Sequence, residues 1–103
     1  MRVRILPSAR RDLSRGIRFY ERQETGLGAY FLDSLGSDID SLHRLAGAHP
    51  ISGGHYRYLS ERFPYWIYYR IENDVAYVVA VLDSRQDPAK PRKREDAERK
   101  RAQ

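Results

Sequence analysis

Arg70 is the residue whose type and position most strongly suggest chemistry. It lies within Tyr65–Ile71, a run of aromatic and β-branched residues that predicts a strand. Alternation along a strand puts Trp66 and Tyr68 on the same face as Arg70. An arginine inside an apolar strand is usually a rim residue paired with a carboxylate, and a guanidinium that faces a ligand is the second interpretation.

The remaining residues that could do chemistry form no recognisable catalytic set. The sequence has no cysteine, which excludes a disulfide framework and a thiolate metal site. It has no Gly-rich phosphate loop, Ser/His/Asp arrangement or metal-ligand cluster, so an ordinary metabolic enzyme is not expected and no cofactor is implied. His43, His49 and His55 are predicted to be surface or capping residues, and only His55, at the start of a strand, merits a test.

Several strands must position these side chains. Val75–Leu82 predicts a strand that pairs with the one before it, because the connecting Asn73 and Asp74 tolerate positive φ and suit an antiparallel hairpin. The alternating segment His55–Ser60 predicts a further strand, and Arg2–Leu6 predicts a short N-terminal one that ends at a proline. The sequence leaves the pairing of the N-terminal strand open.

Two amphipathic helices are predicted between the first strand and the others. The first follows Ser8, a plausible N-cap, and runs to about Glu24, while Gly26 to Gly28 separates it from the second. Such a short link predicts an antiparallel helical hairpin with both apolar stripes turned toward one sheet. The stripes are Ala9, Leu13, Ile17 and Tyr20 in the first helix, and Phe31, Leu35, Ile39, Leu42 and Leu45 in the second.

The order of elements predicts the fold class. A strand, two helices and a three-strand meander form a two-layer α+β domain, with an N-terminal helical hairpin packed on a small, mostly antiparallel sheet. We expect this domain to cover residues 1–88 and residues 89–103 to form a basic C-terminal tail, because almost nothing apolar follows Leu82. Such a tail is predicted to be mobile, or a solvated helix that orders only on a partner.

Charge and hydropathy restrict the partners and the location. The 103 residues carry a formal net charge of +5, which favours acidic partners such as nucleic acid or an acidic protein segment. The N-terminal residues contain Arg2 and Arg4 and no continuous apolar segment, which argues against a secretory signal. No run approaches the roughly 20 apolar residues of a membrane span, so a soluble protein is expected.

Taken together, three motifs resemble the RelE/ParE superfamily of toxins from bacterial type II toxin–antitoxin modules. They are Arg57-Tyr58-Leu59, the aromatic strand Phe63–Ile71 that ends in Tyr-Arg-Ile, and the exit Val81-Leu82-Asp83-Ser84-Arg85-Gln86-Asp87-Pro88. The resemblance covers about residues 2 to 88. It implies a bacterial cytoplasmic protein that forms a hetero-oligomer with a small, acidic-tailed cognate antitoxin.

The RelE-like branch of this superfamily cleaves mRNA on the ribosome. That chemistry needs a group that activates the 2′-hydroxyl, a cation and a general acid around one phosphate. Resemblance makes Arg70, Arg85 and Arg57 the catalytic candidates of such a ribonuclease. Ribonuclease members typically carry a His or Tyr near these arginines after the last strand, whereas none follows Tyr77 here, so we expect no nuclease activity.

The ParE-like branch binds and inhibits DNA gyrase and needs no catalytic residue of its own. This branch is the closer resemblance, so the sequence predicts a toxin that arrests growth by binding its target. The family attributes the target contact largely to the last strand's exit and the C-terminal segment. The target-binding candidates are Asp83, Ser84, Arg85, Gln86, Asp87, Arg92, Lys93 and Arg94.

An antitoxin usually docks as an amphipathic helix and an extended segment on an apolar groove with basic residues nearby. The antitoxin-binding candidates are Arg10, Ile17, Arg18, Tyr20, Tyr30, Phe31 and Arg57, although Ile17 and Phe31 equally suit the core. Two alternatives stay open beside the toxin. One is a nucleic-acid-binding module that uses the basic tail and strand tyrosines, and the other is an inactive toxin fold that only binds an antitoxin.

Overall fold

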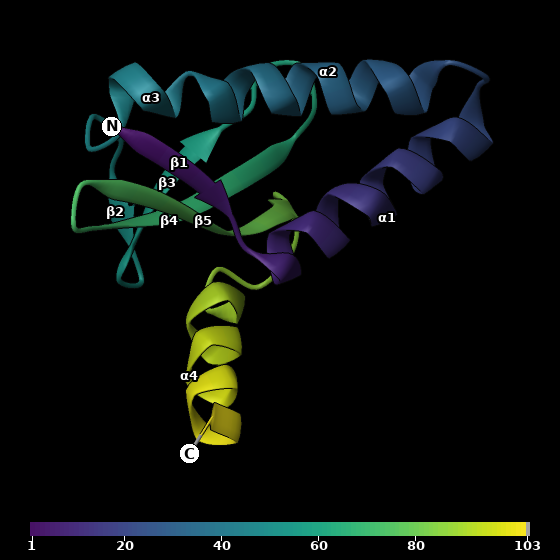
Figure 1. The fold of residues 1–103 in the computed structure, drawn as a ribbon. Helices are drawn as coiled ribbons and strands as arrows, with labels where there is room; N and C mark the ends of the chain where they lie inside the picture. Colours follow the sequence, from purple (N-terminus) through teal and green to yellow (C-terminus); the bar gives the residue numbers. More distant parts are fainter. Residues whose placement is uncertain (103) are drawn as a thin grey trace.

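The computed structural model describes residues 1–102 as helices packed on one sheet, with a last helix that projects from the body (Figure 1). The expected two-layer α+β architecture is confirmed. The elements in chain order are β1 (Arg2–Ile5), α1 (Pro7–Gln23), α2 (Leu27–Asp40), α3 (Leu42–Leu45), β2 (Ile51–Ser52), β3 (His55–Leu59), β4 (Tyr65–Glu72), β5 (Val75–Asp83) and α4 (Lys90–Ala102).

The sheet has the strand order β1-β5-β4-β3-β2. Strands β3, β4 and β5 form the expected antiparallel meander, and Asn73 and Asp74 make its second turn with φ of 50° and 63°. The open question of β1 is resolved by its parallel pairing with β5, from Arg2 opposite Val75 to Ile5 opposite Val78. A two-residue strand, β2, pairs antiparallel with β3, with Ile51 opposite Tyr56 and Ser52 opposite His55.

An irregularity in the β4–β5 pairing decides which side chains of β5 reach the helices. Tyr68 lies opposite Ala80 and Tyr69 opposite Val78, so Val79 is an extra residue in β5. Val78 and Val81 therefore both enter the helix-side core although they are three residues apart. On β4 the predicted alternation holds, because Tyr69 belongs to the helix-side core while Tyr68 belongs to a smaller cluster on the other face.

The two apolar stripes pack on one face of the sheet largely as expected. Phe31 and Leu35 have no exposed surface, but Leu45 was assigned to this stripe wrongly and is 43% exposed. The helix breaks at Ser41, so its last turn forms a separate short helix, α3. A close approach brings the helices together, since a Cβ atom added at Gly16 would lie 2.4 Å from the Phe31 ring.

Polar side chains of α1 complete the edge of β5 where β1 ends. Ser8 was predicted to cap α1, but the N-cap is Leu6 and the Ser8 hydroxyl instead donates to the Val79 carbonyl oxygen at 2.8 Å. One turn later, the Asp12 carboxylate accepts the Val81 N–H at 2.9 Å. Both side chains are buried, so α1 provides hydrogen-bond partners that a strand would otherwise supply.

Helix α4 begins near the first turn of α1 (Figure 1), and its inner side meets the sheet, where Glu95 contacts His55 of β3 and Arg70 of β4. The expectation that this segment is solvated needs correction at its inner side, where Pro91 is fully buried and Arg94 and Glu95 are partly buried. Whether residues 89–103 behave as a separate tail stays a prediction, and Gln103 lies outside the described residues.

No helix in the described part of the chain is long and apolar enough to cross a membrane.

Candidate functional site

The exit of β5 presents a tightly paired carboxylate and guanidinium. Arg85 donates from Nε and Nη2 to the two Asp83 oxygens at 3.0 and 2.9 Å, and its backbone N–H donates to the same carboxylate at 2.8 Å. The hydrogen bonds from Arg85 lower the pKa of Asp83. The Arg85 side chain is 83% exposed, so the pair offers a cation of fixed direction at the surface.

The turn after this pair leads into α4. Ser84 and Gln86 are exposed, and the Ser84 N–H donates to the Pro64 carbonyl at 2.7 Å. Asp87 accepts the Ala89 N–H at 2.9 Å and the Lys93 ammonium at 3.1 Å, and these bonds lower the pKa of Asp87. Asp87 thus closes the N-terminal end of α4 rather than pointing freely at a partner.

The target-binding candidates on α4 divide between its two sides. Arg92 and Lys93 are exposed, whereas Arg94 turns inward and is 20% exposed. The Arg94 guanidinium donates two bonds to the buried Asp12 carboxylate, at 2.9 and 2.7 Å. Arg94 therefore holds α4 to α1 and β5, and of these three residues only Arg92 and Lys93 remain open to a target.

A second inward side chain, Glu95, joins two of the residues that could do chemistry. His55 donates from Nε2 to one Glu95 oxygen at 2.5 Å, and Arg70 donates from Nε to the other at 3.2 Å. Burial alone would raise the pKa of Glu95, but the bonds from His55 and Arg70 together outweigh it and leave the pKa lowered. The expectation of a surface His55 is wrong, because that residue is only 4% exposed.

Arg70 has the carboxylate partners of a rim residue. Besides Glu95 it binds Glu72, with 2.7 Å between Nη1 and Oε2, and its guanidinium lies 4.5 Å from the centre of the Tyr77 ring. Arg57, on the same face, lies 3.8 Å above the Trp66 ring. Both guanidiniums are thus already engaged with protein groups.

The structure does not bring the candidate ribonuclease arginines to one point. Tyr65 pairs with Asp83 at the β5 exit, and Arg70 lies five residues further along β4, so Arg70 and Arg85 stand about 16 Å apart along the sheet. A single phosphate could not contact both in this arrangement. Within residues 1–102 there is also no group of three His, Cys, Asp or Glu side chains that could hold a metal ion.

The antitoxin candidates fall into buried and accessible groups. Phe31 has no exposed surface, and the partly buried Tyr20 packs with it in an aromatic cluster that also contains Phe63 and Tyr65. Burial of Tyr65, with Tyr20 and Asp83 nearby, raises its pKa to about 12. Accessible candidates are Arg10, Arg18 and Tyr30, while Ile17 is partly buried and Arg57 is stacked on Trp66.

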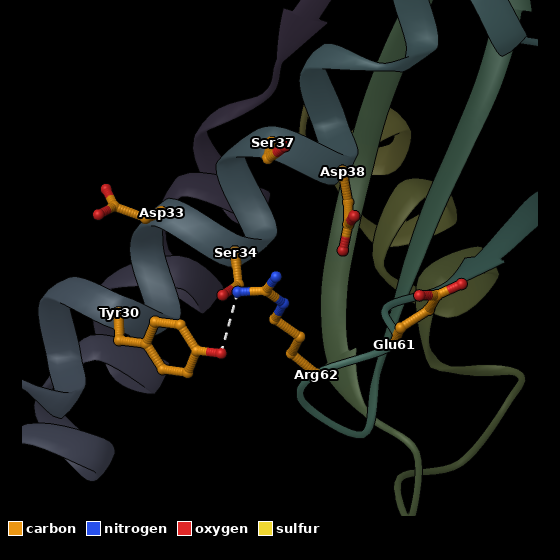
Figure 2. A pocket seen from close by; sticks show the side chains of 7 residues that line it. All are labelled: Tyr30, Asp33, Ser34, Ser37, Asp38, Glu61 and Arg62. Carbon is orange, nitrogen blue, oxygen red and sulfur yellow. Dashed lines mark hydrogen bonds between the residues drawn. The ribbon is translucent and has the colours of Figure 1, made fainter.

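Tyr30 borders an acidic pocket that sequence reasoning missed (Figure 2). The pocket has three carboxylates, those of Asp33, Asp38 and Glu61. Arg62, the basic lining residue, donates to the Tyr30 hydroxyl at 3.0 Å, which leaves these carboxylates without a basic partner among the lining residues. The available signal was the charge of α2, which contains aspartates and no Lys or Arg. The pocket has a volume of about 440 Å³ and is lined by Tyr30, Asp33, Ser34, Ser37, Asp38, Glu61 and Arg62.

A second groove runs between α1 and the β5 exit, with a volume of about 220 Å³. It brings Phe19, which is 46% exposed, next to Asp83, Arg85 and Gln86. Sequence reasoning missed Phe19, although a large aromatic residue that lies off the apolar stripe of an amphipathic helix was the available signal. The groove thus combines an aromatic contact, the oriented Arg85 cation and the end of β5.

These features define a class of protein: a small α+β domain whose exposed functional groups form binding surfaces. Comparison with known families identifies the class more closely, because residues 3–88 match the family described as ParE toxin of type II toxin–antitoxin system, parDE. The chain belongs to this family and is a ParE-like toxin of the RelE/ParE superfamily.

One solved structure, described as the chromosomal ParDE TA system from P. aeruginosa, is similar in fold with a TM-score of 0.72. The two chains are 15% identical, and the match covers 79% of this chain and 92% of that chain. A search of curated proteins finds no match. The family match ends at residue 88, two residues before α4 begins.

Proposed function

We propose that this chain is a toxin that arrests bacterial growth by binding DNA gyrase, and that a cognate antitoxin neutralises it. The groove at the β5 exit is the observation that carries the proposal. It joins exposed Phe19 to three target-binding candidates, Asp83, Arg85 and Gln86, on one accessible surface. Binding requires such a surface and no proton carriers, whereas cleavage requires groups that converge on one phosphate.

The ribosome-dependent ribonuclease is the alternative, and its residues are poorly disposed for that role. Arg70 is paired with Glu72 and Glu95, and His55, which shares Glu95 with it, is buried beneath α4. A phosphate could reach this pair only after α4 had moved. The binding mechanism needs no such rearrangement.

The proposed antitoxin is a small protein with an acidic tail, and the charges of the domain favour one approach. Arg10 and Arg18 on α1 are exposed, so they can pair with acidic side chains. The pocket beside Tyr30 contains three carboxylates and would repel the same side chains. We therefore propose that acidic antitoxin residues meet α1, and that a basic or neutral antitoxin residue meets Tyr30.

A pulse-labelling experiment separates the targets. The chain is induced alone in a bacterial host, and incorporation of labelled thymidine and labelled methionine is followed over the first minutes. Early loss of thymidine incorporation with translation intact supports gyrase as the target. Early loss of methionine incorporation overturns the proposal in favour of the ribosome, and no effect on either favours an inactive toxin fold.

Purified gyrase then tests the groove itself. Phe19→Ser removes the aromatic contact from a side chain that is already exposed, so the fold should persist while inhibition of supercoiling falls at least tenfold. Leu32→Ser is the matched control, because Leu32 is 44% exposed but lies on α2, away from the groove. Equal inhibition by wild type and Phe19→Ser would exclude the groove as the gyrase contact.

A further inference from the structure

The outer face of α1 carries a ridge of four arginines, Arg11, Arg15, Arg18 and Arg22. Their spacing of four, three and four residues places them on one helix face, opposite the buried Ala9 and Leu13. All four are exposed, and the ridge extends about 16 Å along the helix axis. Their guanidiniums therefore form a straight, regularly spaced row of positive charge.

Little negative charge opposes this ridge. Within residues 1–102, the only ion pair that reaches it joins Arg15 to Asp12 at 3.7 Å, and Asp12 is already held at 2.7 Å by Arg94. Glu21, also on α1, is occupied by the backbone N–H groups of Gly26 and Gly28. The ridge therefore keeps most of its charge for a partner.

Helix α4 extends the basic surface at the N-terminal end of the ridge. A notch of about 320 Å³ between α1 and α4 is lined by Arg11 and Arg15 on one side and by Lys90 and Arg94 on the other. Its acidic members are Asp12, which is buried and paired with Arg94, and Glu98. The Arg94–Asp12 bonds hold α4 in the position that forms this notch.

The composition of the ridge indicates the chemistry of its partner. No apolar side chain interrupts the four arginines, whereas the core of a protein–protein interface is usually depleted of charge and rich in apolar area. Exposed Phe19 flanks the ridge on the side of the β5-exit groove, but a single ring does not form the series of stacking platforms on which successive bases of a single strand bind. Guanidiniums alone suit phosphates, which they bind by two parallel hydrogen bonds.

We propose that the ridge and the notch bind the phosphate backbone of double-stranded DNA without reading its sequence. A duplex presents one negative charge per about 1.7 Å of its axis, so each arginine of a straight helix can meet a phosphate. The ridge adjoins the β5-exit groove, since Arg15 lines both the notch and the groove, but the proposed activity does not depend on the identity of the toxin's target. It is a property of the outer face of α1, which lies inside the family match, and of α4, which lies beyond it.

The test measures binding of the purified full chain to a fluorescent 20-base-pair DNA duplex at several NaCl concentrations. Arg11→Gln/Arg18→Gln removes two exposed ridge charges, and Arg2→Gln/Arg44→Gln removes two exposed charges elsewhere. We expect the ridge variant to lower affinity on the order of tenfold at 0.1 M salt and to reduce the slope of log K against log salt by about 1.8. The control should change both much less.

Each other outcome overturns the proposal. Absence of salt-dependent binding by wild type removes it altogether, and equal losses in the two variants show that only net charge matters. Tighter binding to an RNA duplex of the same length assigns the surface to RNA. If polyglutamate competes as effectively per charge as unlabelled DNA, the partner of the ridge is an acidic protein segment. That outcome would agree with Arg18 being also an antitoxin candidate. Circular dichroism melting of both variants verifies that they are folded.

Discussion

Replacing Asp12 and replacing Arg94 should have unequal effects, although the two residues form one ion pair. Asp12 accepts two bonds from Arg94 and also the Val81 N–H at 2.9 Å. Arg94→Met removes only the attachment of α4. Asp12→Ala removes that attachment and also leaves a buried backbone N–H at the edge of β5 without its partner.

The magnitudes follow from these contacts. Enclosed hydrogen bonds to charged groups contribute about 1.5–3 kcal/mol, but Arg94 is 20% exposed, so the pair is worth about 1–2 kcal/mol in holding α4. When α4 detaches, the Asp12 carboxylate regains water, so Arg94→Met cannot destabilise the domain by more than the docking free energy of α4. Asp12→Ala adds about 1–3 kcal/mol for the unsatisfied Val81 N–H.

Urea unfolding followed by Trp66 fluorescence measures the stability of the domain. With a slope of about 1.5 kcal/mol per molar urea, Asp12→Ala should lower the midpoint by about 1.3–3.3 M and Arg94→Met by about 1.3 M at most. Limited trypsin digestion measures detachment of α4, which carries exposed Arg92 and Lys93 as cleavage sites, and both variants should accelerate it. The double variant should match Asp12→Ala, because the attachment is lost in both.

Two results would refute this reasoning. If Arg94→Met destabilises the domain as much as Asp12→Ala, the Val81 hydrogen bond contributes nothing and the edge of β5 does not depend on α1. If the double variant is destabilised by the sum of the single effects, the two side chains act independently and the bidentate pair is not what holds α4.

Three further predictions concern the core, the pH response and Arg70. Gly16→Ala should lower the free energy of unfolding by about 1–3 kcal/mol, because the new Cβ would lie 2.4 Å from the Phe31 ring. Gly36→Ala, whose Cβ would have nothing within 4 Å, should raise it by about 0.5–1 kcal/mol, and urea unfolding measures both. Burial lowers the pKa of His49, so the neutral ring stabilises the fold above the unfolded pKa of about 6.5, and this contribution is lost as pH falls through the folded pKa. His49→Phe should therefore flatten the pH dependence of the free energy of unfolding between about pH 5 and 7. Arg70→Met should lower thermal stability by about 1–2 kcal/mol and loosen α4 while growth arrest persists, and a stable but harmless variant would instead indicate a functional guanidinium.

Local patterns were sufficient for the elements but not for their long-range partners. The stripe of Leu13 and Phe31 and the turn at Asn73 and Asp74 depend on residues close in sequence, and these were predicted correctly. Arg94 and Asp12 are 82 residues apart, and no periodicity links them. The parallel pairing of β1, the extra residue Val79 and the burial of His55 are likewise decided by which elements meet in three dimensions.

The attachment of α4 also explains how a highly charged segment can be ordered. Apart from the buried Pro91, α4 has almost no apolar side chain to bury, so hydrophobic packing cannot hold it. Two inward charged residues, Arg94 and Glu95, meet partners inside the family domain instead. Buried ion pairs add little net stability but specify orientation, because a rotated helix would leave charges unpaired. That orientation keeps Arg92 and Lys93 outward. The inward contacts of Arg94 and Glu95 therefore determine which basic side chains of α4 a partner can reach.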